Sequence, residues 1–287
     1  MIRNLLLTAS VLALTGAVSM PAQAQSAAGA YLAGRHAAVR SDFAESAKYY
    51  GEALALDPKN PEFLESTVLA LLSLGNIERA LPLARVMAAS DQPGQIAYLV
   101  TTAGMAQEED YAGLIAQSAD EGGIGPWVDG LVKAWAQVGA GDMTAALAQF
   151  DALSTEAGMQ GFVMYHKALA LASVGDYEGA EAIFAANQSG SAGQTRRGVI
   201  ARVEILGQLG RNEQALALLT DSFGANSDPE LDDLVAALQG DGQVAFTQIP
   251  DAKAGIAEVF FTFAAVLRNE SAGDYYVLLY SRIARYL

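Results

Sequence analysis

The chain of 287 residues contains no cysteine, only two histidines, and 17 basic against 32 acidic residues. Without cysteine it can form no disulfide, no thiol nucleophile and no cysteine-ligated zinc site. A lipid anchor attached to cysteine is excluded for the same reason. Because the net charge is −15, the chain also lacks the clustered Lys and Arg that bind phosphates, and we expect no nucleic-acid partner.

Motifs for catalysis are missing as well. The sequence has neither the Gly-x-Ser-x-Gly pattern of serine hydrolases nor the Gly-x4-Gly-Lys-Ser/Thr loop that binds nucleotide phosphates. The two histidines, His36 and His166, lie far apart in corresponding segments, and both are predicted to be ordinary residues of helix surfaces. We therefore expect no enzymatic activity, no metal and no cofactor.

Residues 1–24 have the pattern of a secretory signal peptide. Arg3 provides the basic start, an apolar stretch runs from Leu5 to about Val18, and the small residues of Ala22-Gln23-Ala24 suit a signal peptidase. The apolar stretch is shorter than the roughly 20 residues of a membrane span. We expect cleavage after Ala24, no membrane insertion afterwards, and a periplasmic or secreted protein exported by a bacterial Sec-type route.

A pattern of about 34 residues recurs along the chain, in stretches that begin at residues 41, 75, 109, 141, 175 and 210. Each stretch starts with a turn, and most continue with a small residue and then a large apolar one in the same phase. The small residues are Ser46, Ala80, Ala146, Ala180 and Ala215. A small side chain repeated in one phase indicates that helices cross closely there.

Each unit is predicted to hold two helices. Residues 161–174 have apolar side chains at helical spacing, and Gly175-Asp176 supplies a helix end followed by a helix cap. Pro58 and Pro61 form a second kind of joint: Pro58 stops the preceding helix, Asn60 caps the next, and Pro61 takes its first position. Such joints connect stacked hairpins.

The 34-residue period, the Gly-Asp-Tyr turn at Gly175 and the run Ala53-Leu54-x-Leu56-Asp57-Pro58 resemble the tetratricopeptide repeat family. The resemblance implies an all-α fold, a right-handed superhelical solenoid of antiparallel helical hairpins, with about six repeats in residues 25–223. The register in residues 125–153 stays open, because Gly139-Ala140-Gly141 allows two. In one of them Trp135 packs between helices, and in the other it faces a groove.

Residues 224–287 are less regular and are predicted to form an irregular helical extension. It ends in an apolar hairpin of Ile256–Leu267 and Asp274–Leu287. Three alternatives remain for this hairpin. It could continue into further repeats of a longer protein, it could pair with another chain, or it could seal the end of its own fold.

In the family that the chain resembles, first helices line a concave groove, and their second, fifth and ninth positions contact a peptide or partner helix. Carried over, these positions are Tyr31, Arg35, Glu62, Glu65, Leu69, Leu99, Tyr165, Leu169, Arg197, Ile200 and Glu204. The resemblance implies a non-enzymatic protein-protein interaction scaffold in the cell envelope. It would bind another envelope protein or peptide, with possible self-association through residues 256–287. The alternative is the N-terminal repeat region of a longer envelope protein whose activity lies beyond residue 287.

Overall fold

The computed structural model describes residues 26–91, 93–117, 123–156, 158–187, 193–224, 229–240, 244–269 and 274–287. Within these ranges the regular elements are α-helices, and no strand occurs. The prediction of an all-α fold built from helical hairpins is therefore confirmed. The signal peptide predicted for residues 1–24 lies outside the described residues.

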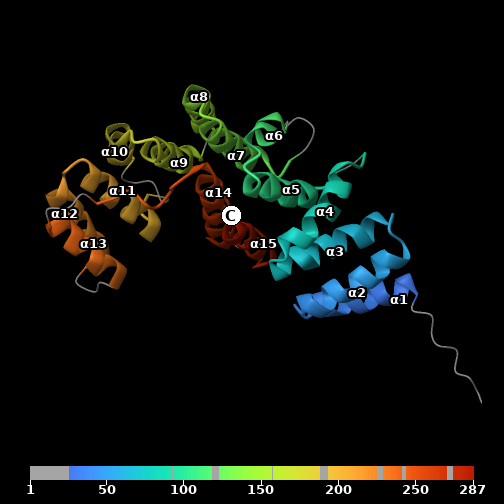
Figure 1. The fold of residues 1–287 in the computed structure, drawn as a ribbon. Coiled ribbons are helices and arrows are strands. Elements are labelled where there is room, and N and C mark those ends of the chain that lie inside the picture. Colours follow the sequence, from blue (N-terminus) through green and yellow to red (C-terminus); the bar gives the residue numbers. More distant parts are fainter. Residues whose placement is uncertain are drawn as a thin grey trace, which may run out of the picture.

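Six helical hairpins follow one another along the described chain, and each helix contacts the next in sequence. Together they form the curved array of Figure 1. The pairs are α1 (Ala27–Val39) with α2 (Phe43–Leu56), α3 (Pro61–Leu74) with α4 (Ile77–Ala88), α5 (Gln95–Gln107) with α6 (Tyr111–Ala116), α7 (Pro126–Gly139) with α8 (Met143–Ser154), α9 (Gln160–Ser173) with α10 (Tyr177–Ala186), and α11 (Arg196–Gln208) with α12 (Asn212–Phe223).

The proline joint forms as predicted. Helix α2 ends at Leu56, and Asn60 accepts hydrogen bonds at Oδ1 from the backbone N–H groups of Glu62 and Phe63, over 3.1 and 3.3 Å. Pro61 occupies the first turn of α3, where no intrahelical partner is needed for its missing N–H. The joint therefore ends one hairpin and begins the next within a few residues.

The turns inside the hairpins also follow the sequence. Gly175 has φ +86°, a conformation that glycine adopts without steric cost, and Asp176 accepts a hydrogen bond from the N–H of Gly179 over 2.9 Å. Asp42, Asp110 and Asp142 cap α2, α6 and α8 in the same way. The negative charge of these residues also suits the positive end of the helix dipole.

The small residues of the repeat lie at the buried helix crossings. Ser46, Ala80, Ala146, Ala180 and Ala215 are all 0% exposed. The large apolar residue that follows four positions later is buried in most repeats, as Tyr50, Phe150, Phe184 and Leu219 show. The phase of the repeat therefore predicted which face of each second helix is buried.

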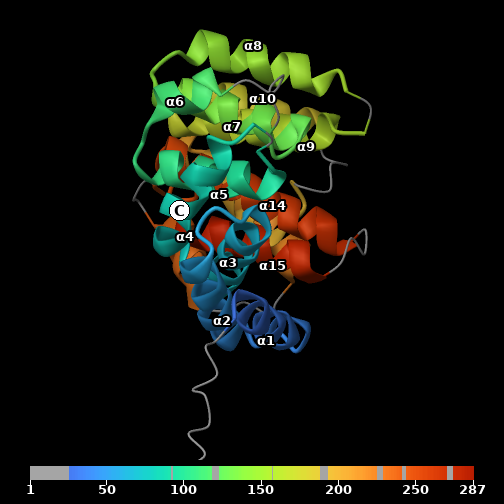
Figure 2. The ribbon, with the colours of Figure 1, turned by 90° about the vertical axis from the view of Figure 1, so that its right-hand side faces the viewer.

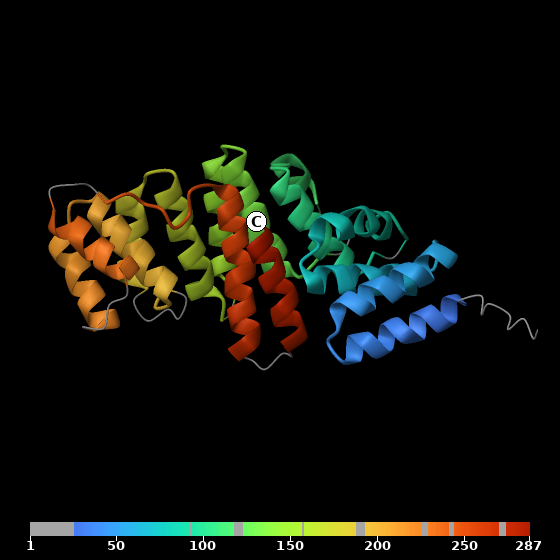
Figure 3. The same ribbon diagram turned by 60° about the horizontal axis from the view of Figure 1, so that its bottom comes forward.

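The C-terminal segment turns back onto the repeats. After α13 (Pro229–Gln239), helices α14 (Ala252–Asn269) and α15 (Asp274–Tyr286) form a hairpin on the inner side of the array, as Figures 1 and 3 show. Helix α14 contacts α5, α7 and α9, and α15 contacts α3 and α5. Figure 2 gives the same arrangement from the side, with the hairpin beside α3 and α5. Of the three alternatives, the described structure shows the hairpin packed against its own chain.

None of the described helices combines the length and the apolar character that a membrane crossing requires.

Candidate binding groove

The candidate site is the inner face of the array, which the first helices α1, α3, α5, α7, α9 and α11 provide; we refer to it as the groove. The hairpin α14–α15 covers the groove from α3 to α9. Its apolar side chains are buried there: Ile256, Val259 and Phe260 of α14 and Leu279 of α15 are 0% exposed. They belong to one core with residues of α3 to α10. This part of the groove is therefore filled by the chain itself.

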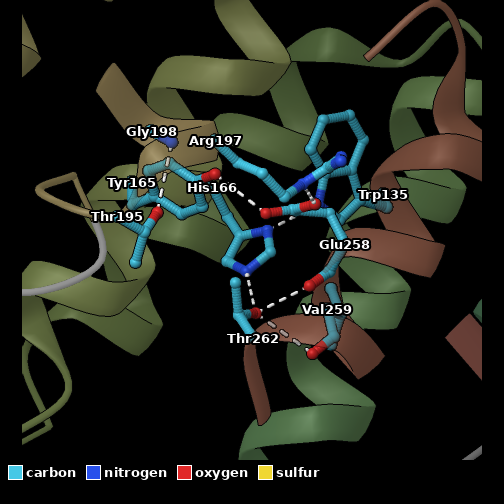
Figure 4. Close-up of polar contacts among 9 residues, drawn as sticks. All are labelled: Trp135, Tyr165, His166, Thr195, Arg197, Gly198, Glu258, Val259 and Thr262. Carbon is cyan, nitrogen blue, oxygen red and sulfur yellow. Dashed lines mark hydrogen bonds and ion pairs between the residues drawn. The ribbon is translucent and has the colours of Figure 1, made fainter. Parts of the chain in front are cut away.

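A buried carboxylate joins α14 to two repeats (Figure 4). Glu258 is 2% exposed. It accepts a hydrogen bond at Oε1 from the hydroxyl of Tyr165 and one at Oε2 from Nε of Arg197, each over 2.8 Å. The guanidinium of Arg197 also lies 5.3 Å from the ring centre of Phe261, in cation–π contact. Side chains from α9, α11 and α14 thus meet at one group.

Burial sets the protonation behaviour of this cluster. It raises the pKa of Glu258, although the charge of Arg197 and the hydrogen bond from Tyr165 act in the opposite direction. Burial and the neighbouring Glu258 carboxylate together hold the pKa of Tyr165 well above its usual range. Both effects favour a phenol that stays protonated and donates to the carboxylate. The Tyr165 hydroxyl therefore makes a directional hydrogen bond to Glu258 within a largely apolar interface.

His166 forms a second polar chain across the same interface. Trp135 can only donate, so its Nε1–H donates to Nδ1 of His166 over 3.2 Å, and Nε2 of His166 then donates to Oγ1 of Thr262 over 3.2 Å. The hydroxyl of Thr262 donates in turn to the backbone carbonyl of Glu258 over 2.7 Å. Burial lowers the pKa of His166 to about 3. The neutral ring therefore links α7 and α9 to α14.

His166 corrects one sequence prediction. It was expected on a helix surface, but it is 0% exposed, because Trp135 and α14 enclose it. His36 is exposed as expected. Trp135 is also 0% exposed, with its ring edge-on to Phe150 at 6.2 Å between ring centres. A Cβ atom at Gly255 would overlap the ring of Trp135. Trp135 thus packs between helices and at the same time faces the occupied groove.

A third polar contact holds the non-helical segment 244–251, which leads into α14. Glu204 of α11 is 5% exposed and accepts hydrogen bonds from the backbone N–H and the hydroxyl of Thr247, over 2.8 and 2.7 Å. It also accepts from the backbone N–H and the side-chain amide of Gln248, each over 3.3 Å. The groove therefore binds the backbone of a non-helical segment here, and it binds side chains of helix α14 farther along.

The structure separates the predicted groove residues into two sets. Those of the third to sixth repeats are mostly covered: Leu99, Tyr165, Leu169, Ile200 and Glu204 are buried, and Arg197 is half-buried. Those of the first two repeats stay at least partly exposed. We call this second set the open groove: Tyr31, Arg35, Glu62, Glu65 and Leu69. Whether either set contacts a partner stays a prediction, but Tyr165, Arg197 and Glu204 already contact the chain's own C-terminal segment.

One partly exposed ring of the open groove, that of Tyr31, packs on two buried aromatic rings. The ring of Tyr31 lies 5.5 Å from that of Tyr50 and 5.2 Å from that of Phe63, between ring centres. The hydroxyl of Tyr31 donates to Oε1 of Glu62, and this hydrogen bond raises the pKa of Tyr31. Residues from α1, α2 and α3 are thereby held in one surface.

Sequence reasoning missed the residues by which the hairpin docks. Glu258, Thr262 and Gly255 lie on one face of α14 but belong to no repeat, so the repeat phase could not identify them. One signal was present: Glu258 is a single carboxylate inside the apolar run of residues 256–267. A charge at such a position, on a helix too apolar to be solvated all round, indicates a buried partner.

Comparison with known proteins gives one family. Residues 31–94 match the family model described as Tetratricopeptide repeat. The matched residues run from Tyr31 in α1 through α4 to Gly94, so they contain the whole open groove. The search of curated proteins gives no match.

Proposed function

Residues 31–94 match the tetratricopeptide repeat model. On this basis we propose that the chain is a non-enzymatic binding scaffold of the bacterial cell envelope and that its open groove holds a segment of another envelope protein. Tetratricopeptide repeats generally mediate protein–protein interaction. The open groove lies within the matched residues, and its side chains remain accessible in α1 and α3. Exposed charged groups beside a partly exposed aromatic ring, on the inner surface of a repeat array, are suited to peptide or helix binding.

One observation carries the proposal. The chain's own hairpin already occupies the groove from α3 to α9, and Glu204 binds the backbone of residues 247 and 248. The groove is therefore able to hold both helical and non-helical polypeptide, with polar groups placed to satisfy them. Helix α15 contacts only part of α3, and the open groove residues Tyr31, Arg35, Glu62 and Glu65 of the first two repeats stay at least partly exposed.

The envelope location rests on residues 1–24 alone. Their basic start, apolar stretch and small residues before Gln25 favour export and cleavage. N-terminal sequencing of the protein recovered from a periplasmic fraction tests this part. We expect a chain that begins at Gln25, whereas an uncleaved chain in the cytoplasm would contradict it.

Site-specific photo-crosslinking in cells tests the binding surface. A photoreactive amino acid is placed at Glu65 in the open groove and, as a matched control, at Val86, which is 59% exposed on the second helix α4. We expect one envelope protein to crosslink at position 65 and not at position 86, and Glu62→Lys to reduce the yield. The same products from both positions, or none from position 65, would contradict the proposal.

A further inference from the structure

A cavity of about 400 Å³ lies where α11, the non-helical segment 244–251 and the hairpin α14–α15 meet. Its volume is within the range of about 300–1,000 Å³ that is usual for small-molecule sites. Ala254 and Ala257, which lie on one face of α14, and Ala284 of α15 line it with small side chains, and these leave the space open. No residue of its wall belongs to the open groove.

Two arginines of the wall have hydrogen-bond donors to spare. Arg197 uses its Nε–H on Glu258 over 2.8 Å (Figure 4), and its two Nη groups have no acceptor within the described part of the chain. Arg285 of α15 is exposed and makes no ion pair with any described residue. Each guanidinium carries five N–H donors in a planar fork that matches a carboxylate. The wall therefore offers donors to an anionic group.

The two carboxylates beside the cavity are already engaged by the chain. Glu258 is 2% exposed, and each of its oxygens accepts a hydrogen bond from a side chain of the repeats. Glu204 is 5% exposed, and it accepts four hydrogen bonds from residues 247 and 248. Neither group is accessible to a ligand, so neither selects a cation.

Other charged side chains of the same elements have partners elsewhere. Nζ of Lys253 lies 3.8 Å from Oε1 of Glu109, and Nε of Arg282 donates to the backbone carbonyl of Ser73 over 3.0 Å. Oδ1 of Asp251 accepts a backbone N–H in the first turn of α14 over 2.8 Å. None of these groups belongs to the wall. Among the described side chains, the two guanidiniums are therefore the accessible charges that a ligand would meet.

Phe261 gives the cavity an apolar side. Its ring is 46% exposed, and the guanidinium of Arg197 lies 5.3 Å from the ring centre. A ligand that covers this ring and the neighbouring alanines removes apolar surface from water, which favours binding. The wall therefore combines an apolar surface with two guanidinium groups.

We propose that this cavity binds an organic carboxylate whose body is an aromatic ring or a short aliphatic chain. The carboxylate accepts hydrogen bonds from the Nη groups of Arg197 and from Arg285, while the body packs on the alanines and on Phe261. Two sources carry this chemistry, a free acid and a glutamate side chain that follows an aromatic residue in a polypeptide. The inference goes beyond the proposed function, because the cavity lies outside the open groove.

Isothermal titration calorimetry on the purified protein tests the proposal. The probe for a free acid is 3-phenylpropanoate, and its matched control is 3-phenylpropanamide, which keeps the shape and lacks the charge. The probe for the second source is acetyl-Ala-Phe-Glu-Ala-amide, compared with its glutamine analogue. We expect the acid of at least one pair to bind at least about 10-fold more tightly than its amide, with affinity falling as salt rises.

The pair whose acid binds more tightly identifies the source. Equal binding of acid and amide within both pairs would overturn the proposal. The absence of binding by either acid at about 10 mM would overturn it as well.

Substitutions locate the binding on the cavity. Arg285 is exposed, so Arg285→Gln is expected to fold normally and to weaken the acid about 5- to 10-fold without affecting the amide. Arg79→Gln, at an exposed site of α4, is the matched control and should leave both affinities unchanged. Ala257→Leu places a larger side chain in the cavity and should weaken the acid and the amide alike. Unchanged affinity for the acid in Arg285→Gln would overturn the proposal.

One further variant checks the role of the arginines. In the purified chain the terminal carboxyl group belongs to Leu287, which lines the same wall and competes for their donors. Two glycines appended after Leu287 move this group away, so the extended chain should bind the acid more tightly. Weaker binding by the extended chain would contradict the assignment of the carboxylate to Arg197 and Arg285.

Discussion

Trp135 of α7 donates its indole N–H to Nδ1 of His166 in α9, across the boundary between two adjacent repeats. This hydrogen bond requires a lone pair on Nδ1, and the other ring nitrogen donates to Thr262 of α14. The histidine is therefore neutral and has its two nitrogens assigned to two different helices. The junction of two repeats with the C-terminal hairpin is thus sensitive to one proton.

The first prediction concerns pH. The folded-state pKa of His166 is about 3, below the 6.5 of a free histidine, so its contribution to stability is complete above pH 6.5 and is lost as pH falls towards 3. At pH 5 we expect the protein to lose about 2 kcal/mol of unfolding free energy through this group, relative to pH 7.5. The pKa of Glu258 is raised in the folded state, so protonation of Glu258 adds to stability as pH falls. This gain partly offsets the loss that comes from His166.

Urea unfolding of His166→Asn isolates the histidine, because Glu258 is present in both proteins. The asparagine variant should lose less stability than the natural chain between pH 7.5 and 5. His36→Asn, at an exposed site, should behave like the natural chain. Parallel pH profiles for the natural chain and His166→Asn would show that the ring does not resist protonation.

The second prediction concerns the contact of Gly255 with Trp135. Gly255→Ala places a Cβ against the indole ring, so either the hairpin or the tryptophan must move. We expect a loss of about 1–3 kcal/mol, measured by urea unfolding. Gly51→Ala is the matched control, since a Cβ there meets no described atom within 4 Å inside α2, and it should stabilise slightly. If the two alanines have equal effects, the close approach is not real.

The third prediction concerns the buried carboxylate. Glu258→Ala removes the acceptor for the hydroxyl of Tyr165 and for Arg197, and we expect a loss of about 3 kcal/mol. Arg197→Met leaves the carboxylate buried without its cation, so this variant should be less stable at pH 8 than at pH 5 relative to the natural chain. Glu213→Ala, at an exposed site of α12, should change stability by under about 0.5 kcal/mol. If Glu258→Ala leaves the free energy of unfolding unchanged, the Glu258 cluster does not stabilise the docked hairpin.

The fourth prediction concerns Glu204 and the segment that leads into α14. Glu204→Ala removes the acceptor of the Thr247 N–H, so hydrogen exchange at that amide should accelerate at least about 10-fold. Glu204→Gln keeps one acceptor oxygen and should give an intermediate rate. The amide of Ile205, in the middle of α11, should exchange alike in the three proteins. Unchanged exchange at Thr247 would mean that Glu204 does not hold the segment.

The sequence was sufficient for helix caps and turns whose signals are local and unambiguous. The joint at Asn60 and Pro61 and the turn at Gly175 and Asp176 were predicted because capping and left-handed turns involve only neighbouring residues. The buried face of each repeat followed from the phase of Ala80 and its equivalents. These features recur, so each repeat supports the interpretation of the others.

The docking of the hairpin could not be predicted in the same way. An apolar periodicity shows that residues 256–287 form helices with a face to bury, but several faces of the chain could receive them. The choice depends on contacts across more than 90 residues, such as that of Tyr165 with Glu258. The burial of His166 could not be predicted for the same reason, because the sequence of α9 does not show that α14 packs against it. Sequence reasoning therefore could not identify the hairpin that covers part of the groove, and the predicted partner contacts of the groove positions stay a prediction.

Carbodiimide crosslinking tests most directly whether the hairpin lies in the groove. Nζ of Lys253, at the start of α14, is 3.8 Å from Oε1 of Glu109 in the third repeat, and the reagent joins such a pair as an amide. Lys48 and Glu45, 3.4 Å apart in α2, serve as the internal control. We predict that mass spectrometry of the monomer band finds the 253–109 link together with the 48–45 link, and that Glu109→Gln removes only the former. A monomer that carries the 48–45 link but not the 253–109 link would contradict the account.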